Sequence, residues 1–169
     1  LDHILFIFGL LFCISGFINI IKTITAFTIA HSITLGLTIF DIIKLPQGTV
    51  EALIALTNVY LAAEITRKEG KLKSPWVMAF CFGLLHGLGF AGALLEFGLP
   101  QESIFLSLVA FNIGIELGQL SFMALILILW FMAKSASLDL IRYSRQISIY
   151  LLGGLSVMWC IERGMIWLV

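Results

Sequence analysis

The stretch SIFLSLVAFNIGIELGQLSFMALILILWFMA, residues 103–133, decides the fold class of this chain. It carries one charged side chain, Glu116, and it exceeds the roughly 20 apolar residues that a helix needs to cross a bilayer core of about 30 Å. A strand of a membrane barrel would instead alternate apolar and polar residues over about ten positions. The run LILILWF at 125–131 does not alternate. The stretch therefore predicts a transmembrane helix that tilts or projects from the membrane.

The composition of the whole chain agrees with this interpretation. Of 169 residues, 60% are hydrophobic and 12% are charged, and the mean hydropathy is +1.09. Soluble domains carry about 25% charged residues, so an ordinary soluble domain, a disordered chain and a nucleic-acid-binding protein are all excluded. Ten basic residues balance ten acidic ones, which indicates no polyanionic partner. The motifs of nucleotide or organic cofactor sites are not found, and Cys13, Cys81 and Cys160 are predicted to be core residues.

Six apolar stretches are predicted to form membrane-spanning helices. They cover roughly 3–20, 24–43, 49–66, 75–95, 103–133 and 147–168. Because the connections are short, we expect an all-α polytopic bundle in which residues 1–169 form a single transmembrane domain. The chain starts at Leu1 within an apolar segment, so we expect a signal peptide or an extracytoplasmic domain upstream.

The basic residues predict the orientation of the chain in the membrane. They follow the third span (Arg67, Lys68, Lys71 and Lys73) and the fifth span (Lys134, Arg142 and Arg145). The positive-inside rule places such loops in the cytoplasm. We therefore expect the 67–73 loop to be cytoplasmic and the N-terminus to lie outside.

Polar side chains within the predicted spans are candidates for function, because each is costly in lipid unless it is paired. Those near the middle of their helices are His31, Asn58, His86, Asn112 and Glu116. Those in the outer third are Asp2, His3 and Glu51. Imidazole and carboxylate groups suit a divalent transition metal. We therefore expect His31 and His86 to face a shared centre with Glu116 within reach, and we expect the outer three residues to form a second site above it.

The spacing of other residues predicts which helix faces point inward. Thr28 and Thr34 flank His31 on one stripe of the second span and could hold its ring. Asn112 and Gln119 share a stripe with Glu116 on the fifth span, and Asn58 adds a further polar group. Each asparagine can also be explained by hydrogen bonding between helices. In the fourth span, a ladder of small residues spaced four apart predicts a close helix crossing, with members Ala79, Gly83, Gly87 and Ala91.

Five segments resemble the HupE/UreJ family, and more closely its second branch. They are LDHILF (1–6), TAFTIAHSITL (25–35), VEALIAL (50–56), FGLLHGLGFA (82–91) and FNIGIELGQL (111–120). The resemblance implies a bacterial inner-membrane protein of six or seven helices. Classical members are linked to hydrogenase or urease maturation and are thought to be permeases for nickel and sometimes cobalt.

The match to the classical family motifs is incomplete. The Asp-His pair of the family corresponds to Asp2 and His3 here. The later motif, Phe-His-Gly-x-x-His-Gly-x-Glu, is matched at Gly83, His86 and Gly87. The three defined positions that differ hold Cys81, Phe82 and Gly89 in place of Phe, His and Glu. The loss of a histidine and a glutamate weakens the case for nickel specificity.

Three functions remain open on the sequence alone. The favoured one is a secondary permease for a divalent metal such as Ni, Co or Zn, working as a homo-oligomer or in a membrane complex because one chain is small for a transporter. The second is an intramembrane metal-dependent hydrolase, although the motif HExxH is missing. The third is a non-catalytic membrane subunit whose polar residues only join helices.

Overall fold

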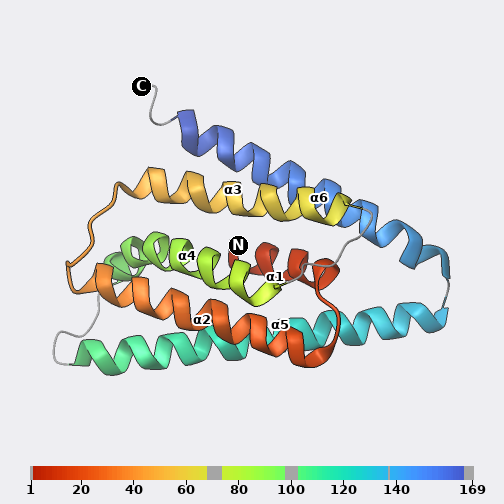
Figure 1. Ribbon diagram of the computed structural model, residues 1–169, viewed down its shortest axis with the longest axis horizontal. Helices are drawn as coiled ribbons and strands as arrows, with labels where there is room; N and C mark the ends of the chain where they lie inside the picture. The colour runs from red at the N-terminus through yellow and green to blue at the C-terminus, as the bar shows by residue number, and fades with distance from the viewer. Residues whose placement is uncertain (1, 68–73, 98–102, 137, 166–169) are drawn as a thin grey trace.

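The computed structural model describes residues 2–67, 74–97, 103–136 and 138–165, and Figure 1 shows their arrangement. This part of the chain forms six helices and contains no strand, which confirms the all-α prediction. The helices are α1 (Asp2–Cys13), α2 (Phe17–Ile39), α3 (Gln47–Thr66), α4 (Pro75–Phe97), α5 (Ile104–Ala136) and α6 (Leu138–Met165).

Helices α2, α3, α4 and α5 are each long and apolar enough to cross a membrane. Helix α1 is apolar but shorter. Together these helices make the chain a membrane protein with the lipid bilayer as its surroundings. Most of the 67–73 loop, residues 68–73, lies outside the described residues.

The predicted first span, 3–20, is wrong as a single helix. Helix α1 ends at Cys13, and α2 begins at Phe17, earlier than the predicted residue 24. Between them Gly16 has a φ angle of 91°, a conformation that side-chain-bearing residues rarely adopt. At 1.5 Å per residue, the 12 residues of α1 reach only about 18 Å, well short of a bilayer core.

Despite its length, α1 is the central element of the core. Phe6, Leu10 and Cys13 are at most 1% exposed and pack with Leu61 of α3 and Leu152 of α6. A side chain at Gly9 would collide with Leu61, so α1 lies close against α3. Apolar side chains of α1, α3 and α6 are thus buried against one another.

The closest helix contact joins α2 and α4. A Cβ atom added to Gly83 would meet the backbone oxygen of Phe27, and one added to Gly87 would meet the backbone oxygen of His31 and the hydroxyl of Thr34. The ladder continues at Ala79 and Ala91, which are fully buried. Small residues let the two backbones touch, as in other membrane helix pairs.

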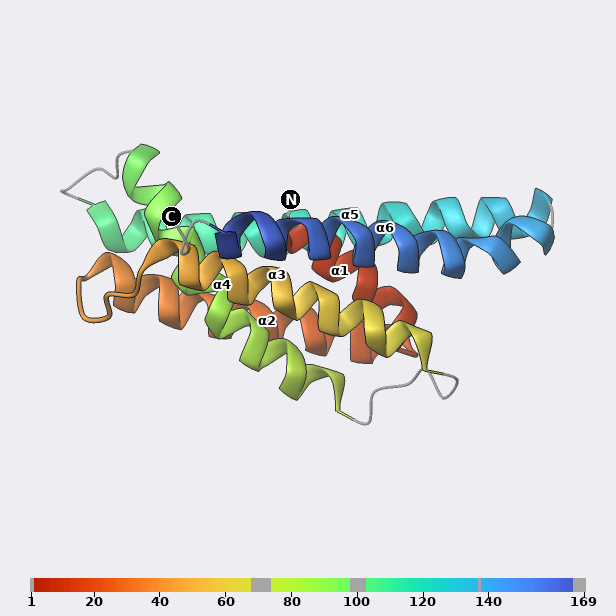
Figure 2. The ribbon, with the colours of Figure 1, turned by 90° about the horizontal axis from the view of Figure 1, so that it is seen from above.

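Helices α5 and α6 form the other side of the molecule. Helix α6 lies along α3, where Gly153 faces Ala62 and the thiol of Cys160 donates to the backbone oxygen of Ala52 over 3.6 Å. Figure 2 shows α5 and α6 projecting together beyond the other helices at one end. The long fifth helix therefore extends past the bundle, as its length predicts.

We expect Gly83→Ala and Gly87→Ala to destabilise the protein, because the new methyl group has no room against the α2 backbone. Overpacking of this kind costs about 1–3 kcal/mol. The matched control is Gly154→Ala on α6, where a Cβ atom meets nothing within 4 Å. That change replaces glycine with a better helix former, so it leaves stability unchanged or raises it. Thermal unfolding in detergent micelles measures the stability of the parent and of the three variants. Equal stability of these four proteins would contradict the close crossing of α2 and α4.

Candidate functional site

Three histidines from three helices meet inside the bundle. The ring centre of His3, on α1, lies 5.0 Å from that of His31 on α2 and 4.9 Å from that of His86 on α4. His31 and His86 are both 0% exposed. These are the three histidines of the whole chain. We call them the histidine cluster.

The packing of the helices explains why the three rings meet. His86 lies between the two glycines of the α2–α4 contact, and Gly87 touches the backbone of His31 itself. The first described turn of α1 brings His3 to the same two rings. His3 therefore belongs to the central cluster and not to the separate outer site that the sequence suggested.

Aromatic rings enclose the cluster. The ring centre of Phe27 lies 5.2 Å from that of His86, Phe6 lies 5.5 Å from the same ring, and Phe90 lies 5.7 Å from His3. These rings offer the imidazole nitrogens no hydrogen-bond partner. The surroundings of the cluster are therefore mainly apolar, and His3 also lines a cavity with Phe90 and Gln119.

Most of the ring nitrogens in the cluster have no partner. Nε2 of His3, both ring nitrogens of His31 and Nδ1 of His86 are buried without a hydrogen bond. Buried polar atoms are almost always paired, because leaving one unpaired costs about 1–3 kcal/mol. Four unpaired nitrogens in one place indicate a site that a ligand would complete.

Thr57 on α3 fixes the proton of His86. Its hydroxyl donates to the backbone oxygen of Ile54 over 2.6 Å and lies 3.2 Å from Nε2 of His86. A threonine hydroxyl has one hydrogen, so Nε2 of His86 must carry the proton and donate it to Thr57. Nδ1 of His86 is then the nitrogen with the free lone pair. Thr57 is one of the polar residues that interrupt the predicted third span, but the sequence alone gave it no role in the site.

The histidine cluster is not in a metal-binding arrangement as its side chains stand. Within the described residues, no group of three or more His, Cys, Asp or Glu side chains could hold a metal ion. The His3 ring meets the other two edge to face, at interplanar angles of 83° and 86°. The rings are close together, but the described side chains as they stand do not form a metal site.

The contacts described for Glu116 lie on the face of α2 that meets α5. Its Oε1 accepts a hydrogen bond of 2.7 Å from the hydroxyl of Thr25, and the residue lines a groove between α2 and α5. On α2, Thr25 and Ser32 face α5, whereas His31 faces α1 and α4. Each residue turns a helix by about 100°, so neighbours in sequence serve different faces. The contacts described for Glu116 therefore place it in a separate polar site.

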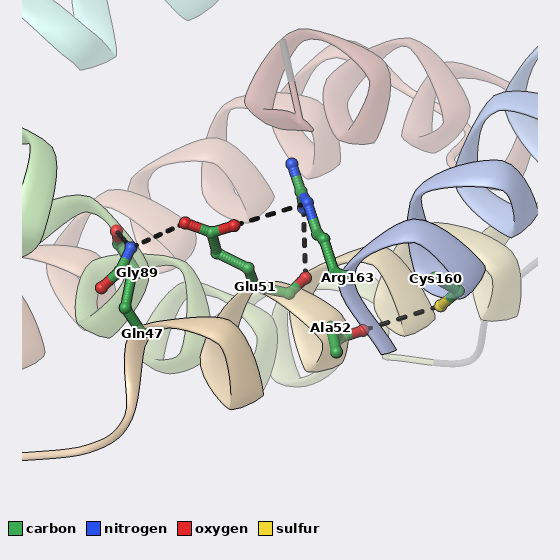
Figure 3. Close-up of polar contacts among 6 residues, drawn as sticks. All are labelled: Gln47, Glu51, Ala52, Gly89, Cys160 and Arg163. Carbon is green, nitrogen blue, oxygen red and sulfur yellow. Dashed lines mark hydrogen bonds and ion pairs between the residues drawn. The ribbon is translucent and has the colours of Figure 1, made fainter. Parts of the chain in front are cut away.

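Glu51 is likewise engaged elsewhere, as Figure 3 shows. Its Oε2 lies 3.6 Å from Nε of Arg163, which also donates from Nη1 to the Glu51 backbone oxygen over 3.1 Å. Gln47 donates from Nε2 to Oε1 of Glu51 and to the backbone oxygen of Gly89, over 3.0 and 2.7 Å. This network joins α3 to α6 and α4, so the predicted outer site with Asp2 and His3 is not assembled around Glu51. The side chain of Asp2 lies outside the described part of the structure.

The remaining polar residues have varied surroundings. The Thr28 hydroxyl lies 3.4 Å from Oε1 of Gln119, which links α2 to α5, and Thr34 bonds to backbone oxygens of its own helix. Neither threonine forms a hydrogen bond to the His31 ring, although the sequence predicted that they could hold it. Asn112 donates to the backbone oxygen of Leu108 over 2.8 Å. Both polar side-chain atoms of Asn58 are buried without a partner, which nothing else in the described structure explains.

Comparison with known proteins gives one finding. A family model described as HupE / UreJ protein matches residues 1–163, which is nearly the whole chain. No curated protein and no solved structure matches. The family match covers all six helices, including the three that carry the histidine cluster. The chain therefore belongs to the HupE/UreJ family, in its second branch.

Proposed function

We propose that the histidine cluster binds a divalent transition metal ion, of the Ni, Co or Zn type, and that the protein carries this ion across the membrane as a secondary permease. The observation that supports this most strongly is the set of four unpaired ring nitrogens on His3, His31 and His86. Neutral imidazole is a preferred ligand of these metals. The chemistry of the donors therefore fits the proposed ion.

The spacing of the rings also supports a single bound ion. A metal–nitrogen bond of about 2.0–2.1 Å places the ring centre about 3.2 Å from the ion, so two ligands at a tetrahedral angle have ring centres about 5.2 Å apart. The observed separations from His3 are 5.0 and 4.9 Å. Turning a ring about its Cβ–Cγ bond moves its nitrogens but hardly moves its centre, and this torsion is soft. Rotation of the rings would therefore turn a nitrogen of His3 and one of either neighbouring histidine toward a shared ion without moving the helices.

The surroundings of the cluster bear on the hydrolase alternative. The described members of the cluster are three imidazoles, and the carboxylates of Glu51 and Glu116 are bonded to other groups. A hydrolase would need a carboxylate or similar base beside the ion. The position of Glu116 against Thr25 therefore argues against the hydrolase alternative.

The family supports the same proposal at a coarser level. The HupE/UreJ family is linked to the handling of nickel and cobalt. The departures at Cys81, Phe82 and Gly89 leave the choice among metals to the three histidines. Binding by imidazoles alone suits cobalt, nickel and zinc alike.

We place the protein in the bacterial inner membrane with the N-terminus outside, because the basic residues gather after α3 and α5. In this orientation residue 70 is cytoplasmic. In a Gly70→Cys variant whose native cysteines are replaced, a membrane-impermeant thiol reagent should label the protein only after the cells are broken. Labelling of intact cells, or of spheroplasts from outside, would contradict the orientation.

We expect His3→Ala, His31→Ala and His86→Ala each to weaken Co²⁺ binding by at least about tenfold, the loss that even an outer-shell partner causes. Visible absorption of bound Co²⁺ measures the affinity in detergent micelles. The control is Cys81→Ala, which removes an exposed soft donor outside the cluster and should bind like the parent. If the three histidine variants are folded and bind Co²⁺ like the parent, the metal proposal is wrong and a structural role replaces it.

Transport is tested with the same proteins in liposomes. The parent should move Co²⁺ or Ni²⁺ into vesicles that contain a fluorescent chelator, and the His31→Ala protein should not. A parent that binds the ion but never moves it would contradict the permease and bring the hydrolase back.

A further inference from the structure

A second polar site lies in the groove between α2 and α5. The groove has a volume of about 340 Å³. Four polar residues line it (Thr28, Ser32, Asn112 and Glu116), and the exposed apolar residues at its edge are Ile29, Phe105, Val109 and Ile113. Polar atoms in such an apolar setting are costly unless something pairs with them. We therefore expect the groove to bind a ligand of its own.

Asn112, which lines this groove, has an unpaired side-chain oxygen. The residue is 9% exposed, and its Oδ1 is buried without a partner. Its Nδ2 donates to the backbone oxygen of Leu108 over 2.8 Å. A backbone oxygen can only accept, so the NH₂ end must face Leu108 and the oxygen must be the end left over. Oδ1 of Asn112 can therefore accept a hydrogen bond or bind a cation.

The other groups in the groove present oxygens as well. The Ser32 hydroxyl donates its hydrogen to the backbone oxygen of Thr28 over 2.7 Å, which leaves only its lone pairs. Glu116 supplies a carboxylate, of which Oε1 accepts from Thr25 over 2.7 Å. The hydroxyl of Thr28 is directed to Oε1 of Gln119 over 3.4 Å. Carboxylate, amide and hydroxyl oxygens with their hydrogens already used form a donor set for a hard cation.

We propose that this groove binds a small monovalent alkali cation, for which Na⁺ is the test ion, at Glu116, Asn112 and Ser32. The charge of the ion follows from the charge of the site. One carboxylate and one monovalent cation sum to zero, whereas a divalent ion would leave a net charge next to lipid. The oxygen donors also separate this site from the histidine cluster, whose nitrogen donors suit transition metals.

The two sites lie on different faces of α2. Ser32 follows His31 directly in sequence, and Thr25 and Thr28 serve the α5 side. The Na⁺ site does not depend on the proposed function, because it uses none of the histidines. A cation bound between α2 and α5 would hold these two helices together beside the cluster.

The test measures ²²Na⁺ bound by the purified protein in detergent micelles with a chelator present, so that the histidine cluster is free of divalent metal. We expect about one Na⁺ per chain, together with a higher unfolding temperature in NaCl than in choline chloride of equal ionic strength. Glu116→Gln and Asn112→Leu should each weaken ²²Na⁺ binding by at least about tenfold and remove the salt-specific stabilisation. Glu162→Gln, which changes an exposed carboxylate on α6, should bind like the parent.

The outcomes separate this inference from the metal proposal. A parent that binds no ²²Na⁺ and unfolds at the same temperature in both salts overturns the Na⁺ site, even if Co²⁺ binds normally. Retention of ²²Na⁺ binding in both groove variants also overturns it. Folded His31→Ala protein should keep its Na⁺ binding, and Glu116→Gln protein should keep its Co²⁺ binding. Should one groove variant fail to fold, the other variant and the parent measurement still decide.

Discussion

The backbone contact between α2 and α4 is the constraint on which the site depends. Gly83 and Gly87 let α4 touch the carbonyl groups of Phe27 and His31, where any side chain would hold the helices apart. The same contact sets the height and rotation of both helices, so His31 and His86 reach the same region of the bundle. Helix α1 adds His3 from its first described turn. The position of the three histidines thus follows from the packing of helices α1, α2 and α4.

The histidine cluster is costly for the protein without a ligand. Each helix satisfies its own backbone groups, as a membrane requires, but four imidazole nitrogens remain unpaired among phenylalanine rings. Only His86 is oriented by a hydrogen bond in the described structure, and that bond to Thr57 leaves Nδ1 free. A protein that needed these histidines only to join helices would pair them with neighbouring helices. The described structure shows no such pairing for the His31 ring.

Much of the fold could be predicted from the sequence, because long apolar stretches have few alternatives in a membrane. Helices α3, α4 and α5 begin and end close to the predicted limits. The break at Gly16 was missed because its neighbours are apolar, so hydropathy continues through a point where the backbone turns. The sequence also assigned His3 to an outer site, whereas its ring centre lies 5.0 Å from that of His31.

The site was predictable only in part, for a different physical reason. Burial cost predicts that His31, His86 and Glu116 avoid lipid, but it does not say which neighbouring helix each one faces. Glu116 accepts a hydrogen bond from Thr25, on the face of α2 that meets α5. Glu51 pairs with Arg163, which lies 112 residues further along the chain. Pairings over such distances depend on the packing of whole helices, and a single sequence does not contain that information in readable form.

Nitrogen NMR of histidine offers the most direct test of the central claim, that three imidazoles form one metal site. The chain has three histidines, so protein labelled with ¹⁵N-histidine contains only the rings in question. Without metal, the account predicts that His86 carries its proton on Nε2 and that Nδ1 is unprotonated. Addition of Zn²⁺ should shift one nitrogen of each of the three rings to the position of a metal-bound imidazole, in step with one ion per chain. Three rings whose nitrogen signals stay unchanged at saturating Zn²⁺ would contradict the account.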